Sequence, residues 1–347
     1  MHISELDTPV LTVDLDVLER NINNMAALCR EIGIHLRVHT KTHKVPEIAK
    51  MQVAAGSKGI TCQKLGEAEA MVDAGVDDIL IPYNIVGKPK LARLTQLVKR
   101  AKITVALDSE ETARGISEQA RADDCTVRVI IELDTGGHRC GVQSPHAALE
   151  LAQKLTRLPG LDFQGMMTYP SNDRAKPFID ETVDLLKGAG IPANIISGGG
   201  TGAERASKAL GCTETRSGSY VYEGMTRISG SHTLNPERCA LRMVVTVVSA
   251  PTAARIIVDG GQKTFTSYPP NPYGYVIEHP EIKIYGMSVE HGHIDVSGSP
   301  HKFRVGERLS VIPLHQGMTS NLHDELVAVR NGTVQAIWKI AGRGKVR

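Results

Sequence analysis

Short apolar runs, many of them rich in β-branched residues, recur along the chain up to residue 217, and helical spacing of apolar positions fills most stretches between them. We expect strands at residues 36–39, 59–62, 78–82, 103–107, 127–133, 163–168, 193–197 and, from a weaker run, 213–217. Alternating strands and helices form parallel sheets with crossover helices. Eight such units in about 220 residues fit an α/β fold of the (β/α)8 TIM-barrel type better than an open doubly wound sheet.

The helix expected before the first strand illustrates this pattern. Its apolar face, at 4-3-4 spacing, consists of Leu18, Ile22, Met25 and Cys29. Asp16 and Glu19 fit a capping box at its start. A short helix is also expected at residues 203–210.

The pattern changes after residue 235. Short extended runs follow, with little helical periodicity, at residues 241–249, 254–258, 281–288, 293–296, 308–313, 325–330 and 333–341. We therefore expect a barrel domain over residues 1–235 and a mostly β C-terminal domain over residues 236–347; residues 1 to about 15 can instead pack with the C-terminal domain. Residues 265–275 are dense in turn-forming and aromatic residues and are expected to form a long loop.

Lys+Arg (40) and Asp+Glu (38) nearly cancel in this 347-residue chain, and the formal net charge is +2. Such a chain has no bulk field to attract nucleic acid or an anionic membrane, which favours a small-molecule substrate. The six cysteines are dispersed without a Cys-x-x-Cys pair, as is typical of reduced thiols. The first residues fit no secretion signal, and no apolar run reaches the roughly 18 residues of a membrane span. We expect a soluble cytoplasmic protein.

Polar and glycine residues follow the predicted strands at their carboxyl ends, where barrel enzymes place their chemistry. In strand order they are Lys41, Gln63, Tyr83 and Asn84, then Asp134 and Arg139, Tyr169, the run from Ser197 to Gly202, and finally Ser217, Gly218, Ser219 and Tyr220. Because the strands of a barrel are parallel, we expect these residues to gather on one face.

The first of these strand ends carries the run His39-Thr40-Lys41-Thr42-His43-Lys44. Crowding by other cationic groups lowers the pKa of an ammonium group, and only the neutral amine attacks a carbonyl. Lys41 and Lys44 are therefore both candidates for a Schiff-base lysine. A basic surface loop explains the local composition at least as well.

The glycine run Gly198-Gly199-Gly200-Thr201-Gly202 precedes the short helix expected at residues 203–210. Glycines let the backbone approach an anion, a helix N-terminus offers unpaired N–H groups, and Thr201 adds a hydroxyl. A tight strand-to-helix turn is an equally good explanation of the run alone. Together with a lysine on the same barrel face, a phosphate site suggests pyridoxal phosphate (PLP).

Three further residues can have either a ligand-binding role or a structural role. Arg139 can bind the cofactor's phenolate oxygen or a substrate carboxylate, or it can pair with Asp134 or Glu132 to order its loop. Tyr169 and Tyr220 can stack on a cofactor ring, although packing aromatics with satisfied hydroxyls are the commoner case.

Histidines and carboxylates recur in two loops of the C-terminal domain, in Glu290-His-Gly-His293 and in the segment from Pro313 to Asp324. If the loops converge, these side chains could bind a divalent metal, because imidazole suits zinc or manganese. Loop histidines are more often surface or cap residues.

The run from Arg37 to Lys44 reads Arg-Val-His-Thr-Lys-Thr-His-Lys, and other distinctive segments stand at residues 7–10, 62–69, 78–82, 134–142, 197–202, 218–221, 290–292 and 341–344. Together they resemble the D-threonine aldolase and D-serine dehydratase family of fold-type III PLP enzymes, which are related to alanine racemase. The family motif is Arg-Pro-His-x-Lys-Thr-His-Lys. The pattern is most similar to that of D-threonine aldolases and 3-hydroxy-D-aspartate aldolases.

The resemblance implies that Lys41 forms the Schiff base with PLP, that Arg139 lies near the phenolate oxygen, and that Tyr169 is the active-site tyrosine. The other residues expected to contact the cofactor are Gln63, Ser197, Gly199, Gly200, Thr201, Gly202, Gly218, Ser219 and Tyr220. It also implies a homodimer.

In this family the histidine of a Pro-x-His-x-Cys/Asp motif and the residue two places on bind a divalent metal. Here the motif reads Pro313-Leu-His315-Gln-Gly317, and glycine has no side-chain ligand. Either His315 binds Mn, Zn or Mg with half of the usual protein ligands, or His315, His293 or His323 acts as a general base.

The resemblance implies retro-aldol cleavage of a β-hydroxy-D-amino acid to glycine and an aldehyde, with Lys41, His315, Tyr169 and Arg139 as the catalytic set. β-Elimination, as in a D-serine or 3-hydroxyaspartate dehydratase, and racemisation are the alternatives among PLP enzymes. A PLP carrier without turnover, or a barrel enzyme that uses the glycine loop without a Schiff base, are the alternatives outside them.

Overall fold

The structure is a computed structural model that describes residues 1–225, 234–266 and 272–347. The chain divides into two compact units. The barrel unit comprises Met25–Lys41, Pro46–Gly218 and Gly344–Arg347, and the β unit comprises Met1–Asn24, Thr42–Val45 and Ser219–Arg343. The chain passes between the units several times, and a domain boundary at residue 235 stays a prediction.

Eight strands of the barrel unit close into a parallel barrel in sequence order. They are β2 (His35–His39), β3 (Gly59–Thr61), β4 (Asp78–Ile81), β5 (Lys102–Leu107), β6 (Val127–Leu133), β7 (Leu161–Thr168), β8 (Ile195–Gly198) and β9 (Glu214–Thr215). The barrel closes where His35 and Leu36 of β2 lie opposite Glu214 and Thr215 of β9. The predicted (β/α)8 barrel is confirmed.

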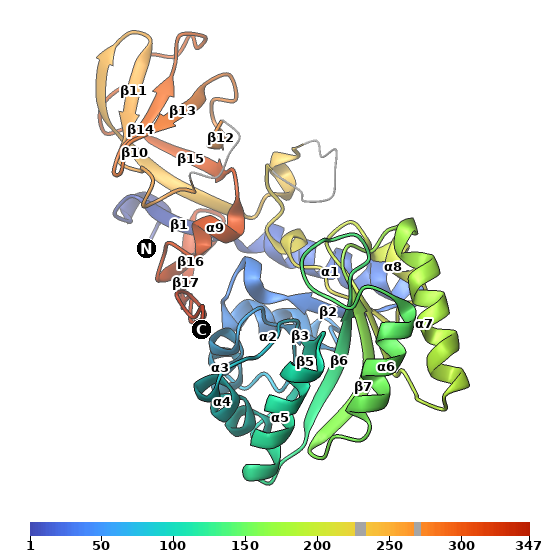
Figure 1. Ribbon diagram of the computed structural model, residues 1–347. Helices are drawn as coiled ribbons and strands as arrows, with labels where there is room; N and C mark the ends of the chain where they lie inside the picture. Colours follow the sequence, from blue (N-terminus) through green and yellow to red (C-terminus); the bar gives the residue numbers. More distant parts are fainter. Residues whose placement is uncertain (226–233, 267–271) are drawn as a thin grey trace. The chain divides into compact units, whose positions relative to one another are not determined.

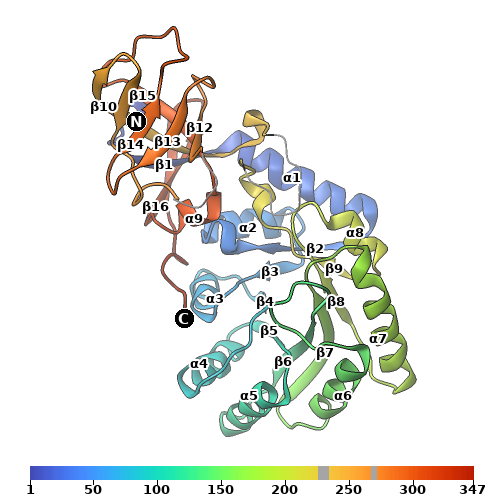
Figure 2. The same cartoon turned by 45° about the horizontal axis from the view of Figure 1, so that its top comes forward.

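Helices connect the barrel strands and lie outside them, as Figure 2 shows for α3 to α7. They are α1 (Leu15–Ile32), which leads into β2, and α2 (Pro46–Ala54), α3 (Leu65–Asp73), α4 (Lys88–Val98), α5 (Glu110–Ala122), α6 (Pro145–Leu155), α7 (Lys176–Gly188) and α8 (Glu204–Ala209). In α5 the buried side chains are Ala113, Ile116, Ser117 and Ala120, which fall on one helical face. Amphipathic helices of this kind cover strands that are themselves buried on both faces.

The β unit is built on one nine-stranded sheet (Figure 1). Its strands are β1 (Val10–Asp14), β10 (Leu241–Thr252), β11 (Arg255–Val258), β12 (Gly274–Val276), β13 (Lys283–Met287), β14 (Gly292–Asp295), β15 (Arg308–Pro313), β16 (Glu325–Arg330) and β17 (Thr333–Lys339). The N-terminal strand β1 pairs antiparallel with β10 and parallel with β16. The predicted mostly β C-terminal region is confirmed.

Among the described residues, two strands and one α-helix were not expected from the sequence. They are β1, the strand β12 near the end of the predicted loop at residues 265–275, and the short helix α9 (Gln316–Ser320). Residues 267–271 of that predicted loop lie outside the described residues.

The capping box predicted for α1 is wrong. Oδ1 of Asp14 accepts the N–H of Val17 at 3.1 Å, so Asp14 caps the helix. Asp16 is already inside the first helical turn, where its side chain points outward, and it pairs with Arg330 at 2.8 Å. Glu19 pairs with the same arginine at 2.6 Å. Both carboxylates therefore stabilise the outer face of α1 rather than its end.

All six cysteines are free thiols. Burial raises the pKa of Cys29 and Cys212 to about 11, so these thiols remain protonated at neutral pH. Within the described residues, every helix is too short or too polar to cross a membrane.

Candidate active site

The two candidate lysines lie in different environments. Lys41 lies in η2 (Thr40–Thr42), the turn directly after β2. Lys44 has a positive φ of 57° and belongs to the β unit, where its Nζ donates to Oδ1 of Asn321 at 2.7 Å. The composition of this run left both lysines open, and the family resemblance indicated Lys41; their surroundings in the structure differ as well.

Lys41 retains solvent-exposed surface, yet enough protein surrounds it to change its titration. Partial loss of solvation lowers the pKa of its ammonium group below the ordinary value of 10.5. The positive charges of Arg139 and Arg216 lower the pKa further, while Glu67 opposes them. A neutral amine is therefore more available at Lys41 than at an ordinary surface lysine.

His39 ends β2 immediately before this turn and is buried. Desolvation, followed by the charges of Lys41 and Arg216, lowers its pKa well below the ordinary value of 6.5. Its Nε2 lies 3.2 Å from Oε1 of Gln63, and its Nδ1 lies 3.5 Å from the backbone N–H of Lys41. A neutral ring with the proton on Nε2 satisfies both contacts. His39 thus orients Lys41 without adding a positive charge.

Arg139 pairs with Glu132, one of the two partners considered from the sequence. Its Nη2 donates to Oε1 of the buried Glu132 at 3.1 Å, and its guanidinium carbon lies 5.4 Å from the centroid of the Tyr169 ring. Asp134 instead orders the loop, because its Oδ1 accepts three backbone N–H groups between Gly136 and His138. These hydrogen bonds lower the pKa of Asp134 despite its partial desolvation. The Arg139 side chain remains 54% exposed, which leaves it accessible to a ligand.

Arg216, which follows β9, was missed from the sequence. It is buried, its Nη1 donates to the carbonyl oxygen of Ser197 at 2.6 Å and to Oγ of Ser197 at 2.8 Å, and its Nη2 donates to the carbonyl oxygen of Thr168 at 2.8 Å. It occupies the same strand end as the predicted residues Ser217 and Gly218. A cation at that end of the weakest predicted strand was the available signal.

The glycine run lies against both Arg216 and Tyr169. A Cβ on Gly199 would approach Cβ of Arg216 to 3.0 Å, so a side chain there would force the loop off the arginine. Gly200 has a φ of +107°, and the nearest atom to a Cβ built on it is Cε2 of Tyr169 at 3.6 Å. The run is therefore both a tight turn and a close approach of the backbone to the strand ends.

One amide of this loop already binds an anionic group. The N–H of Gly202 donates to both carboxylate oxygens of Glu204 at 3.0 Å, and Oγ of Ser217 donates to the same carboxylate at 2.6 Å. The N–H of Gly218 donates to Oγ1 of Thr201 at 3.1 Å. Backbone and hydroxyl groups of this kind match the donors that a phosphate requires.

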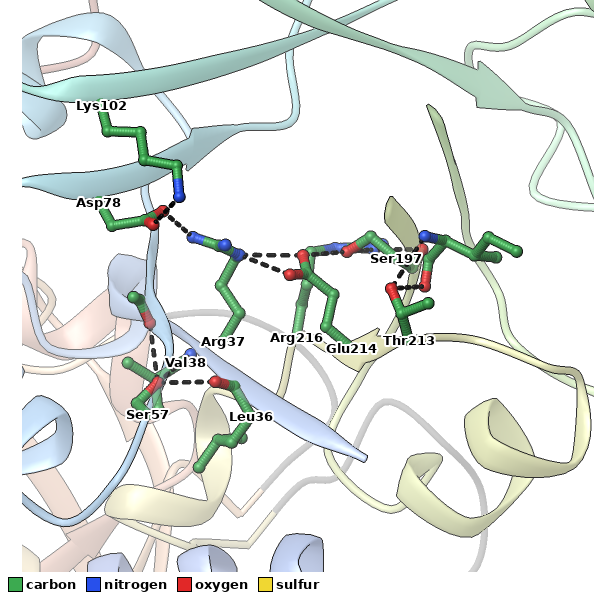
Figure 3. A network of polar contacts seen from close by, with 12 residues as sticks. Leu36, Arg37, Val38, Ser57, Asp78, Lys102, Ser197, Thr213, Glu214 and Arg216 are labelled. Atoms are coloured by element: carbon green, nitrogen blue, oxygen red, sulfur yellow. Dashed lines mark hydrogen bonds and ion pairs between the residues drawn. The ribbon is translucent and has the colours of Figure 1, made fainter. Parts of the chain in front are cut away.

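Beneath these groups lies a buried network of charges, shown in Figure 3. Arg37 donates from Nε to both carboxylate oxygens of Glu214 at 2.9 Å and from Nη1 to Asp78 at 2.6 Å. Oγ of Ser197 donates to Glu214 at 2.8 Å and accepts from Arg216. The network therefore connects the interior ion pairs of the barrel to Arg216.

Three further predicted residues have surroundings or positions of their own. Tyr83 packs its ring against Nζ of Lys64 at 3.7 Å and is 39% exposed. Ser219 and Tyr220 lie in η4 (Ser219–Val221) of the β unit, with Tyr220 buried.

The predicted histidines of the β unit serve local structure. His315 is the N-cap of α9, where its Nδ1 accepts the N–H of Met318 at 3.2 Å. Nε2 of His323 lies 2.9 Å from the carbonyl oxygen of Thr264, and Nε2 of His293 lies 3.0 Å from Oγ of Ser288. Among the described residues, none of the three belongs to a group of His, Cys, Asp and Glu close enough to share a metal ion. The predicted convergence of two metal-binding loops is therefore not found there.

Family models and known proteins match almost the whole chain. The model for the alanine racemase N-terminal domain matches residues 13–225, and the model described as "Putative serine dehydratase domain" matches residues 240–329. A D-threonine aldolase from an Arthrobacter species is 35% identical over 99% of this chain and 94% of its own length. The chain belongs to the D-threonine aldolase and D-serine dehydratase family.

Two further relatives support the aldolase side of this family. A 3-hydroxy-D-aspartate aldolase from Paracoccus denitrificans is 32% identical over 99% of this chain and 94% of its own length. The crystal structure of a D-threonine aldolase from Filomicrobium marinum superposes with a TM-score of 0.91, at 31% identity, over 99% of this chain and 98% of that one. The family resemblance read from the sequence is confirmed.

Proposed function

We propose that this protein is a PLP-dependent lyase that cleaves β-hydroxy-D-amino acids by retro-aldol chemistry to glycine and an aldehyde. The observation that carries the proposal is Lys41, an amine of lowered pKa beside Arg139 and Arg216 at the carboxyl ends of the barrel strands. It is supported by full-length similarity to two D-amino acid aldolases.

The residues at the strand ends fit PLP. Lys41 would bond to the aldehyde carbon of PLP. The glycine run between Ser197 and Gly202, with Gly218, would bind the phosphate of PLP. Arg139 and Tyr169, already in contact with each other, would border its ring. Gln63, Ser219 and Tyr220 remain candidates for further contacts. When bound, PLP supplies an electron sink conjugated with the Cα of the substrate.

The side chains divide the remaining tasks. Lys41 would bond to the cofactor through its neutral Nζ, and once displaced by the amino group of the substrate the same atom, now protonated, could give a proton to Cα. His39 is neutral and hydrogen bonded to Gln63. It therefore holds the turn of Lys41 in place without placing another positive charge beside that lysine. Arg139 offers an exposed guanidinium that would pair with a carboxylate or phenolate oxygen.

The β-hydroxyl proton needs an acceptor, and we assign it to His315 acting as a general base. The ring can accept at Nε2 only if the proton resides on Nδ1, which requires loss of the hydrogen bond from Met318. Coordination of a metal through Nε2 requires the same change. Breaking a helix cap costs about 1 kcal/mol, which is small beside a catalytic barrier.

A variant separates this catalytic role from the capping role. Asparagine caps helices well, so His315→Asn is expected to retain the thermal stability of the parent while losing activity by roughly 10²-fold or more. Steady-state kinetics and a melting curve on the same preparation test this, with His315→Ala as the variant that loses both properties. Full activity in His315→Asn would remove His315 from the mechanism.

A divalent metal, Mn, Zn or Mg, is the other route to deprotonating the hydroxyl. Because Gly317 lacks a ligand, we expect activity to survive dialysis against EDTA. Loss of activity in EDTA with recovery on adding Mn²⁺ or Zn²⁺ would contradict the metal-free assignment and make His315 a ligand.

The cationic surroundings of Lys41 predict a pH effect. Removing the charge of Arg139 raises the Lys41 pKa, so covalent attachment of PLP to the apoenzyme should begin at higher pH in Arg139→Gln than in the parent. The rate of attachment, followed by absorbance from pH 6 to 10, gives the midpoint. Arg174→Gln, an exposed arginine in η3 (Asp173–Ala175), is the control. An unchanged midpoint in Arg139→Gln would contradict the coupling.

β-Elimination is the second candidate, favoured by the match of residues 240–329 to a serine dehydratase domain. It would give a keto acid and ammonia in place of glycine and an aldehyde, so the products distinguish the two reactions. Hydroxide is a poor leaving group, and the missing ligand at Gly317 is one reason to prefer the aldol reaction.

We also propose that the enzyme works as a cytoplasmic homodimer. The dispersed, unpaired cysteines support a reducing compartment. The family resemblance supports the dimer, and native mass measurement tests it.

A further inference from the structure

Three potential metal ligands outside the proposed active site lie together in the β unit. They are His279, His301 and Glu307, and one ligand atom from each lies within 4.8 Å of the other two. Among the described residues, this is the one group of three or more His, Cys, Asp or Glu side chains that meets this distance.

Each member is placed by a turn of the sheet. His279 lies between β12 and β13 and is followed by Pro280, whereas His301 lies between β14 and β15 and is preceded by Pro300. Glu307 lies immediately before β15. Proline restricts its own backbone and that of the preceding residue, so both histidines come from stiffened turns.

The side chains are already arranged as a group. The two imidazole rings stack with centroids 4.7 Å apart, and Phe303 packs edge-on against them at 4.8 Å and 4.6 Å. Nε2 of His301 lies 2.7 Å from Oε1 of Glu307. Two imidazoles and a carboxylate are therefore already close enough for one ion to bridge them.

Neighbouring groups orient two of the three candidates. Nδ1 of His279 lies 3.4 Å from Oε1 of Glu281, and that carboxylate accepts from Oγ of Ser299 at 2.5 Å. Oε2 of Glu307 accepts the backbone N–H of Arg304 at 3.0 Å. Carboxylates behind a ligating imidazole and hydrogen bonds to a ligating carboxylate are typical supports of metal sites.

We propose that His279, His301 and Glu307 form a binding site for Zn²⁺ or a similar divalent transition metal. Imidazole and carboxylate ligands suit Zn²⁺, Cu²⁺ and Ni²⁺, whereas Mg²⁺ and Ca²⁺ prefer oxygen ligands throughout. Three protein ligands leave the fourth tetrahedral position for water. The ion would link the β12–β13 turn, the β14–β15 turn and the start of β15. The site shares no residue with the proposed catalytic set.

The competing explanation is a pair of ordinary His–carboxylate contacts, His279 with Glu281 and His301 with Glu307. Each such pair would stabilise the turns without any ion. Metal binding measured directly on the PLP-loaded full-length protein separates the two explanations. The His315→Ala background removes the histidine of the family's metal-binding motif.

Zinc affinity is measured in this background by competition with a colorimetric chelator, and Co²⁺ absorbance reports the ligand environment. We expect one bound equivalent in the His315→Ala protein, and affinity at least about 10-fold weaker on adding His279→Ala or His301→Ala. His146→Ala is the matched control, because His146 makes a single exposed contact with Glu181 at 3.7 Å. It should bind as the parent does.

Two results would overturn the site. One is the absence of a bound equivalent in the His315→Ala protein, and the other is equal affinity before and after His301→Ala is added to it. Zn²⁺ should also raise the melting temperature of the parent and leave that of His301→Ala unchanged. Melting without metal verifies that each variant folds. Because binding is measured without substrate, failure of this site leaves the proposed lyase activity untouched, and loss of that activity leaves the site untouched.

Discussion

Lys41→Ala is expected to lose lyase activity by on the order of 10³-fold or more, because no other group takes over a nucleophile that bonds to the cofactor. Lys41→Arg keeps the positive charge and most of the length but cannot bond to an aldehyde, so it should lose as much. Equal loss in the two variants assigns the effect to the amine and not to the charge.

The attachment itself can be located. Borohydride reduction of the PLP-loaded protein, followed by peptide mass analysis, should place the cofactor on Lys41 and not on Lys44, whose ammonium group is hydrogen bonded to Asn321. Labelling of Lys44, or unchanged turnover in Lys41→Ala, would contradict the assignment.

Glu214→Gln is expected to destabilise the barrel unit by about 3 kcal/mol, because it leaves buried arginines with less compensating charge. The side chain of Glu214 is 1% exposed and that of Arg37 is 4% exposed. Desolvation opposes the charge of Arg37, while Glu214 and then Asp78 raise its pKa. Asp78 would remain as the partner of Arg37, whereas the single oxygen of the glutamine amide would replace the two carboxylate oxygens that Arg37 and Ser197 now share.

Urea unfolding tests this stability effect. The midpoint should fall in Glu214→Gln with little change in the slope, since the surface exposed on unfolding is the same. Glu110→Gln is the control, because Glu110 pairs with Lys154 and Arg114 on the helix surface and its loss should change little. A midpoint in Glu214→Gln equal to that of the parent would mean that the network adds no net stability.

The barrel could be predicted because its signal is local. Strands such as β6 are short runs rich in apolar, β-branched residues between helices with one apolar face, and their order along the chain is their order in the barrel. β1 is different, because it pairs with β10 and β16, both more than 200 residues away in sequence. No local pattern reports such partners, so its five residues were not assigned to a strand.

The site residues that follow clear strands could be predicted, and the one that follows a weak strand could not. Lys41, Arg139, Tyr169 and the glycine run follow clear strands, so barrel geometry alone groups them. Arg216 follows β9, whose two residues give the weakest strand signal in the barrel, and it was passed over. The lowered pKa of Lys41 depends first on burial and then on Arg139 and Arg216, which are distant in sequence. Such charge relations require the folded chain.

The most direct test of the central claim is product analysis with D-threonine and PLP, with and without Mn²⁺. The account predicts glycine and acetaldehyde in equal amounts, and no product from L-threonine. A keto acid with ammonia, L-threonine as product, or no reaction at all under either condition would contradict it.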